Sequence, residues 1–121
     1  GMPNNAVDVY MGIGGAQEGI LAAAAIRCFG GQMQGRLVIR NDDDAIKARG
    51  TGIEDLDTKY IATDMACGNV TFAATGISEG PMLNGVELFP GGATTHSMVM
   101  RSRTGTFRFI KGHHKFNKLD N

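Results

Sequence analysis

The sequence lacks an excess of charge of either sign, because its 12 Lys and Arg residues are balanced by 12 Asp and Glu residues. A chain without net charge has no global electrostatic attraction to nucleic acid or to an anionic membrane, so we expect neither partner. It also lacks a long apolar run, since the longest, residues 20–26, falls far short of the roughly 20 residues that a membrane helix needs. No signal-peptide pattern is evident, and we expect a cytoplasmic protein.

Cysteine and proline are scarce as well. Two cysteines, Cys28 and Cys67, cannot form a disulfide framework or, by themselves, a four-ligand zinc site, so we expect them to remain thiols in a reducing compartment. Three prolines, and no glycine at every third position, exclude a collagen-like chain. Glycine itself is abundant, with 18 residues, which predicts many tight turns.

A chain of 121 residues without a linker or an internal repeat has the size of one domain. We therefore expect a single domain over residues 1–121. Gly1, which precedes Met2, is interpreted as the remnant of a cleaved expression tag. Residues 113–121 are polar and are expected to fray as a tail.

The first third of the chain predicts a strand, a glycine-rich loop and a helix. Apolar and polar residues alternate from Ala6 to Met11, with the period of a strand. The loop covers Gly12–Gly19, and the helix covers Ile20–Phe29, with Gly30 as its C-terminal cap. Because this helix is apolar almost all round, we expect it to be buried against a sheet.

The remaining chain predicts shorter elements. Strands are expected over Gln34–Arg40, Lys59–Ala62, Asn69–Ala74, Gly85–Phe89, Thr94–Met100 and Thr106–Lys111, the last two as a hairpin, and short helices over Asp42–Arg49, with Asn41 as N-cap, and Asp64–Cys67. Strand–helix alternation followed by a strand-rich end predicts an α/β fold, in which a mixed β-sheet is covered by helices.

The glycine-rich loop has the pattern of an anion site. Glycines let the backbone approach a phosphate, and the first turn of the following helix supplies free N–H groups and partial positive charge. Two nucleotide-binding patterns fail, however. A dinucleotide loop needs glycine where Gln17 stands, and a Walker A loop needs lysine where Ile20 stands.

Glu18 is unexpected beside such a phosphate cradle, because a carboxylate repels phosphate. A divalent cation that bridges the carboxylate and a phosphate oxygen would explain it. The alternative is structural, since a glutamate in the first helical turn also complements the helix dipole, by roughly 0.3–1 kcal/mol.

Three segments together carry a family resemblance. They are VDVYMGIGGAQEGILAAAAIRCFGGQMQGRL at residues 7–37, FAATGISEGPMLNGV at residues 72–86, and GGATTHSMVMRSRTGT at residues 91–106. In this order and spacing they resemble the class II fructose-1,6-bisphosphatases, including the cyanobacterial type that also acts on sedoheptulose 1,7-bisphosphate. The resemblance covers only the C-terminal part of such an enzyme.

The resemblance implies the layered α/β/α fold of the lithium-sensitive sugar-phosphatase superfamily, and hydrolysis of the 1-phosphate of a sugar bisphosphate with Mg²⁺ or Mn²⁺. On the family loop GIGGxPEG, Gly15 falls on a substrate-binding position and Glu18 on a metal ligand, and Gly12, Gly14 and Gly15 form the phosphate loop. Gln17 stands where the family has proline, which leaves the helix start less preset.

The resemblance also implies that the chain is incomplete for catalysis. The family's other acidic metal ligands, an Asp-Pro motif and a DGD segment lie upstream of this chain. Asp42, Asp43 and Asp44 do not replace them, because neighbouring carboxylates on a short helix point different ways and complement its dipole. We expect a truncated protein or a partial open reading frame, rather than half of a complex completed by a second chain.

Two other functions remain as alternatives. A non-catalytic module would bind a sugar phosphate or pack against a subunit without turnover, and a nucleotide binder would bind ATP or NAD. If the chain is a truncated domain, the surface that the missing portion would cover is exposed and apolar, so we expect a homo-oligomer, a dimer or larger.

The C-terminal region adds charge rather than a site. We expect His96 to be packed or hydrogen-bonded in its strand, and His113 and His114 to be solvated. Five basic residues are expected on a solvent-facing hairpin: Arg101, Arg103, Arg108, Lys111 and Lys115. The segment around Thr75 and Gly76 has no assigned role.

Overall fold

The computed structural model describes residues 8–116. Contacts within the chain divide it into two compact units, residues 1–68 and residues 69–121, and each is described by itself. In the part of the chain that the structure describes, no helix is long and apolar enough to cross a membrane.

Helix α1 (Ala16–Phe29) follows the glycine-rich segment, as expected, but begins earlier than the expected start at Ile20. Ala, Gln and Glu are good helix formers, so the helix starts directly after Gly15, whose backbone is extended, with φ −64° and ψ 152°. Its C-terminal end is as expected, since Gly30 adopts the left-handed conformation with φ 77° and donates its N–H to the carbonyl oxygen of Ile26.

Helix α1 packs against α3 (Ala62–Met65) within the first unit. Ala23 of α1 and Ala62 of α3 are both buried. Arg27 ties the two elements together, because its Nη1 donates a hydrogen bond to the carbonyl oxygen of Ala66 at 2.7 Å. Cys28 on α1 is buried, and no disulfide joins it to the exposed Cys67.

The expected burial of α1 against a sheet is not found within its own unit. Ile20 remains 49% exposed and Leu21 remains 59% exposed. Inside its own unit α1 meets the single turn of α3, which is too short to cover the whole apolar surface of a 14-residue helix.

The first unit also holds a two-stranded antiparallel sheet and helix α2 (Asp42–Gly50). Strand β1 (Gln34–Arg36) pairs with β2 (Lys59–Ile61), so the strand expected over Gln34–Arg40 ends early. It ends there because Arg36 already lies opposite Lys59, the first residue of β2, and residues 56 and 57 just before β2 form a turn. The helical turn expected at Asp64–Cys67 begins at Ala62 instead, where Asp64 accepts a hydrogen bond from the Ile61 N–H at 2.9 Å.

The strand expected over Ala6–Met11 is wrong for the residues that can be judged. Residues 8–11 form no strand, and residues 6 and 7 lie outside the described residues. Alternation alone does not make a strand, because the backbone needs a neighbouring strand to bond with, and none is found among the described residues. Val9 and Met11 are accordingly exposed, by 76% and 89%.

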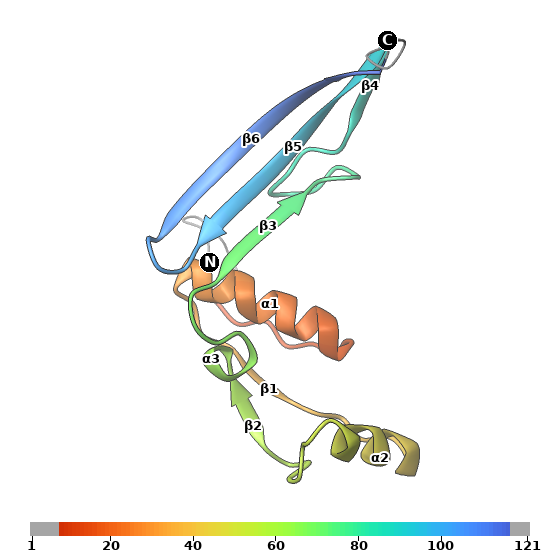
Figure 1. Ribbon diagram of the computed structural model, residues 1–121, viewed down its shortest axis with the longest axis vertical. Coiled ribbons are helices and arrows are strands. Elements are labelled where there is room, and N and C mark those ends of the chain that lie inside the picture. Colours follow the sequence, from red (N-terminus) through yellow and green to blue (C-terminus); the bar gives the residue numbers. More distant parts are fainter. Residues whose placement is uncertain (1–7, 117–121) are drawn as a thin grey trace. The chain divides into compact units, whose positions relative to one another are not determined.

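The second unit is a four-stranded antiparallel sheet built around β5 (Gly92–Arg101). Strand β6 (Thr106–Lys115) pairs along the whole of β5, and β3 (Thr71–Thr75) and the short β4 (Glu87–Phe89) pair with its two ends (Figure 1). All strand pairings among the described residues are antiparallel, so the expectation of a mixed sheet is wrong for this part of the chain.

The hairpin is confirmed and is longer than expected. Its turn lies at residues 102–105, and Gly105 adopts a positive φ of 63°. Strand β6 continues to Lys115, so His113 and His114 belong to a paired strand and not to a frayed tail. They pair opposite Thr94 and Ala93 because the register set at the turn carries on to the start of β5. Residues 117–121 of the expected tail lie outside the described residues.

Candidate functional site

The N-terminal end of α1 has the features of an anion cradle. The first four N–H groups of a helix have no acceptor within the helix. Gly15, at the N-cap, has no side chain with which to satisfy them, and no side-chain cap is present. The first turn is closed by a hydrogen bond of 3.0 Å from the Gly19 N–H to the Gly15 carbonyl oxygen. The free amides and the positive end of the helix dipole therefore face the same point.

The Glu18 side chain folds back toward that point. A Cβ atom placed on Gly15 would overlap Oε2 of Glu18, so the carboxylate lies directly beside the Gly15 backbone. Glu18 is exposed, and it has no hydrogen bond or ion pair with any described residue. The carboxylate is thus close to the cradle and open to a ligand, although the same position also complements the helix dipole.

The other glycines of the predicted phosphate loop differ in their surroundings. Around Gly14, a Cβ atom would meet nothing within 4 Å, whereas at Gly12 it would lie 3.0 Å from the Tyr10 hydroxyl oxygen. Neither glycine, nor Gly15, has a positive φ. Gly14 therefore provides a bare backbone that another molecule can approach closely, and none of the three glycines is needed for an unusual chain conformation.

Other carboxylates do not join Glu18. Within residues 8–116, no group of three or more His, Cys, Asp or Glu side chains is placed to hold a metal ion. Glu18 is a hard oxygen donor of the kind that Mg²⁺ and Mn²⁺ prefer. Residues 8–116 therefore offer a divalent cation one ligand at this position, Glu18, and the remaining ligands must come from other residues.

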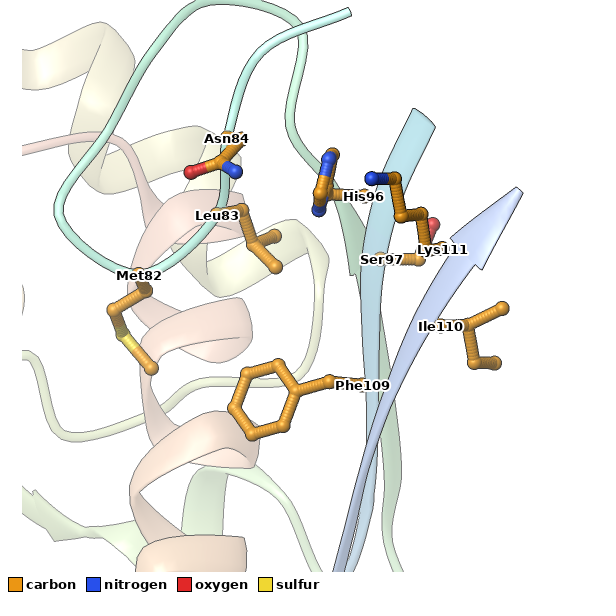
Figure 2. Close-up of a pocket in the computed structure, with 8 residues that line it drawn as sticks. All are labelled: Met82, Leu83, Asn84, His96, Ser97, Phe109, Ile110 and Lys111. Atoms are coloured by element: carbon orange, nitrogen blue, oxygen red, sulfur yellow. The ribbon is translucent and has the colours of Figure 1, made fainter. Parts of the chain in front are cut away.

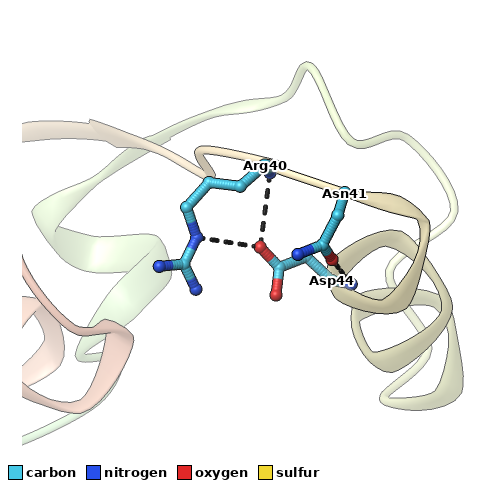
Figure 3. Close-up of polar contacts among 3 residues, drawn as sticks. All are labelled: Arg40, Asn41 and Asp44. Atoms are coloured by element: carbon cyan, nitrogen blue, oxygen red, sulfur yellow. Dashed lines mark hydrogen bonds and ion pairs between the residues drawn. The ribbon is translucent and has the colours of Figure 1, made fainter.

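Of the three aspartates that open α2, Asp44 has structural partners instead. Asn41 caps the helix, as expected, by accepting a hydrogen bond from the Asp44 N–H at 2.8 Å, a kind of contact that contributes about 1 kcal/mol. Oδ2 of Asp44 accepts from Nε of Arg40 at 3.1 Å (Figure 3). The hydrogen bonds from the Arg40 side chain and backbone hold the pKa of Asp44 below its ordinary value. Asp44 is therefore engaged in capping and pairing, and not presented to a metal.

The hairpin histidines lie partly as expected, since His113 and His114 are exposed to solvent. His113 and His114 have threonine partners across the strands, with 2.9 Å between Thr95 Oγ1 and His114 Nε2. His96, which we expected to be packed or hydrogen-bonded, is half-buried and makes no side-chain hydrogen bond to a described residue. It lines a hollow in the second unit that our sequence analysis missed. The register of the predicted hairpin could have indicated this hollow, because it pairs His96 with Lys111.

Comparison with known proteins covers almost the whole chain. Residues 1–114 match the family model described as bacterial fructose-1,6-bisphosphatase, glpX-encoded. The chain is 38% identical over 125 residues to a Trichodesmium erythraeum (strain IMS101) protein named D-fructose 1,6-bisphosphatase class 2/sedoheptulose 1,7-bisphosphatase. Two proteins of Acaryochloris marina (strain MBIC 11017) with names of the same type are 39% and 36% identical.

These alignments are unequal in what they cover. They include 93%, 91% and 92% of this chain but only 36%, 35% and 36% of the three relatives. The chain therefore spans about a third of the length of the curated relatives it matches. The family resemblance carried by the three quoted segments is confirmed by the family match.

Proposed function

We propose that this chain supplies one metal ligand and part of the phosphate site of a sugar-bisphosphate phosphatase. The chain belongs to the family of bacterial, glpX-encoded fructose-1,6-bisphosphatases and corresponds to the C-terminal portion of such a protein. The substrate is fructose 1,6-bisphosphate, and also sedoheptulose 1,7-bisphosphate, the two sugars in the names of the relatives. The reaction is hydrolysis of the 1-phosphate.

The observation that carries this proposal is the position of one carboxylate. Glu18 lies beside the bare backbone of Gly15, at the free amides of α1, and has no partner among the described residues. Gly14, where a Cβ atom would meet nothing within 4 Å, leaves room for a phosphoryl group to approach the chain next to Gly15, and the α1 amides donate hydrogen bonds to its oxygens. Glu18 cannot serve that anion directly, because two negative charges repel each other, so its role is to hold a cation next to it.

A bound Mg²⁺ or Mn²⁺ would supply charge neutralisation at the phosphoryl oxygens and activation of the attacking water. This chain contributes one of the required oxygen ligands, Glu18, and residues 8–116 hold no cluster of three or more side chains that could bind the metal. The chain by itself is therefore catalytically incomplete. The residues that position the attacking water lie in the portion of the family's proteins that this chain does not cover. The family relationship also supports the sugar-phosphatase superfamily fold and a homo-oligomeric enzyme as parts of the same proposal.

Phosphate release separates this proposal from the alternative of a non-catalytic module. The 121-residue chain by itself is expected to release no phosphate from fructose 1,6-bisphosphate above the buffer rate, with either Mg²⁺ or Mn²⁺. The same chain, fused behind the N-terminal two thirds of the Trichodesmium relative, is expected to release phosphate in a metal-dependent reaction. We call this fusion the joined protein.

Two contrary results of the phosphate-release experiment would overturn different parts of the proposal. Steady metal-dependent turnover by the chain alone would contradict its incompleteness. Binding of the bisphosphate by a folded joined protein, without turnover, would favour the non-catalytic module over the phosphatase.

A further inference from the structure

The loop of residues 76–86, for which the sequence suggested no role, is held in one shape by its own backbone. Its ends are fixed by hydrogen bonds of 3.0 Å from the Gly76 N–H to the His96 carbonyl oxygen and from the Val86 N–H to the Ile77 carbonyl oxygen. At Gly85, the N–H donates to Oε2 of Glu79, also at 3.0 Å. The loop is thereby anchored to β5 and cross-braced from within.

Glycine is required at both ends of this loop for steric reasons. A Cβ atom on Gly76 would overlap the carbonyl oxygen of Asn84, and one on Gly85 would lie 2.8 Å from the backbone nitrogen of Glu79. Backbone atoms cannot move aside as a flexible side chain can. The close approach of the loop's two arms, and hence the direction in which its tip points, depends on these two glycines.

The tip of the loop faces the sheet across a hollow of about 330 Å³. Met82, Leu83 and Asn84 border it on the loop side, and side chains of β5 and β6 border it on the other (Figure 2). Leu83 and Phe109 supply apolar surface, while His96 and Lys111 lie next to each other at one end. The volume is that of a small-ligand site, which is typically apolar with a few convergent polar groups.

Among residues 8–116, no side chain forms an ion pair that compensates the charge at that end. His96 and Lys111 are direct partners in the β5–β6 register, so their side chains project from the same face of the sheet. Neither side chain has a hydrogen bond or ion pair with a described residue. No acidic residue lines the hollow. An ammonium and an imidazole, with no carboxylate lining the same hollow, favour an anion.

We propose that this hollow binds a small organic anion, with its phosphate or carboxylate group between His96 and Lys111 and its apolar body against Leu83 and Phe109. Lys111 provides the positive charge, and His96 donates a hydrogen bond from its ring. The apolar side chains select against a fully hydrated inorganic ion. This site uses no residue of the Gly12–Glu18 segment, and it goes beyond the proposed phosphatase function.

Calorimetric titration of the 121-residue chain tests the site. Phenyl phosphate and benzoate carry the two possible anionic groups on the same apolar ring, and inorganic phosphate is the probe without the ring. At least one of the two ring compounds is expected to bind roughly tenfold more tightly than inorganic phosphate, because binding removes the apolar surface of the ring from water. Lys111→Gln is expected to weaken this binding roughly tenfold, through loss of a charge-assisted hydrogen bond.

Lys115→Gln is the matched control. Lys115 is an exposed lysine of the same strand, pairs opposite Gly92, and does not line the hollow. It is expected to leave binding unchanged. Phe109→Ala is expected to weaken binding of the ring compound but not of inorganic phosphate, and because Phe109 is 60% exposed, circular dichroism should show the fold unchanged.

The proposal is overturned if neither ring compound binds more tightly than inorganic phosphate. It is equally overturned if the two lysine substitutions weaken binding to the same extent, which would mean general attraction to a basic strand.

Discussion

Glu18→Gln in the joined protein is expected to lower kcat for fructose 1,6-bisphosphate by about 100-fold or more. The substitution keeps the size and the helix position of the side chain but removes its charge, so the metal loses a carboxylate ligand. Changes in groups that merely support a metal ligand already reduce affinity or activity by about 10- to 100-fold, and loss of the ligand itself should exceed that. The measurement is phosphate release as a function of Mn²⁺ concentration.

Glu54→Gln is the matched control for this loss of charge. Glu54 is an exposed glutamate of the same unit, and it lies in a segment outside the helices and strands. The control variant should retain the parent kcat and the parent Mn²⁺ dependence. If Glu18→Gln also retained them, the carboxylate would serve only the helix dipole, and the proposed metal site would be wrong.

Gly15→Ala is expected to reduce Mn²⁺ affinity and kcat of the joined protein, on the order of tenfold to a hundredfold. The new Cβ atom would occupy the space of the Glu18 Oε2 atom and force the carboxylate away from the cradle. A displacement of about 1 Å of a positioned group can cost as much as 100-fold in rate. The apparent dissociation constant for Mn²⁺ and kcat should both be measured, because displacement of the carboxylate ligand affects the two together.

Gly14→Ala separates this steric effect from a general effect of alanine in the loop. A Cβ atom at Gly14 meets nothing within 4 Å, and its backbone has no positive φ, so this variant should behave like the parent protein. Neither variant should change the free energy of unfolding by more than about 1 kcal/mol, since a poorer N-cap is offset by lower entropy of the unfolded chain. Equal loss of activity in both variants would contradict a specific contact between Gly15 and Glu18.

The elements that could be predicted from the sequence are those with local signals. Asn41 as N-cap and Gly30 as C-terminal cap define helix ends through contacts only a few residues away, and both were correct. The β5–β6 hairpin followed from the spacing of two strand patterns around a short turn that includes Gly105. In each case the determining interactions lie close together in the chain.

The errors arose where a distant partner decides the structure. The alternation before Gly12 is a sound strand pattern, but no neighbouring strand exists for it among the described residues, and the alternation by itself cannot reveal that. The same holds for β1, whose length is limited by β2. The sequence placed Glu18 in the loop before the expected helix, with the first helical turn as the structural alternative, and α1 does include it. The position of its carboxylate beside Gly15 depends on a side-chain rotamer, which a sequence does not specify.

The hollow beside β5 illustrates a third limit. His96 and Lys111 are fifteen positions apart, and only the register of the hairpin brings them opposite each other. Once the hairpin was predicted, that pairing could have been derived. The contribution of Met82 and Leu83 could not, because it depends on the path of a loop fixed by close glycine contacts.

The location of a bound metal tests the central claim most directly. A crystal of the joined protein soaked in Mn²⁺, with diffraction measured near the manganese absorption edge, should show an anomalous peak about 2.1 Å from a carboxylate oxygen of Glu18, at the N-terminal end of α1. A fully occupied manganese peak elsewhere in the joined protein, with Glu18 directed to solvent, would contradict it.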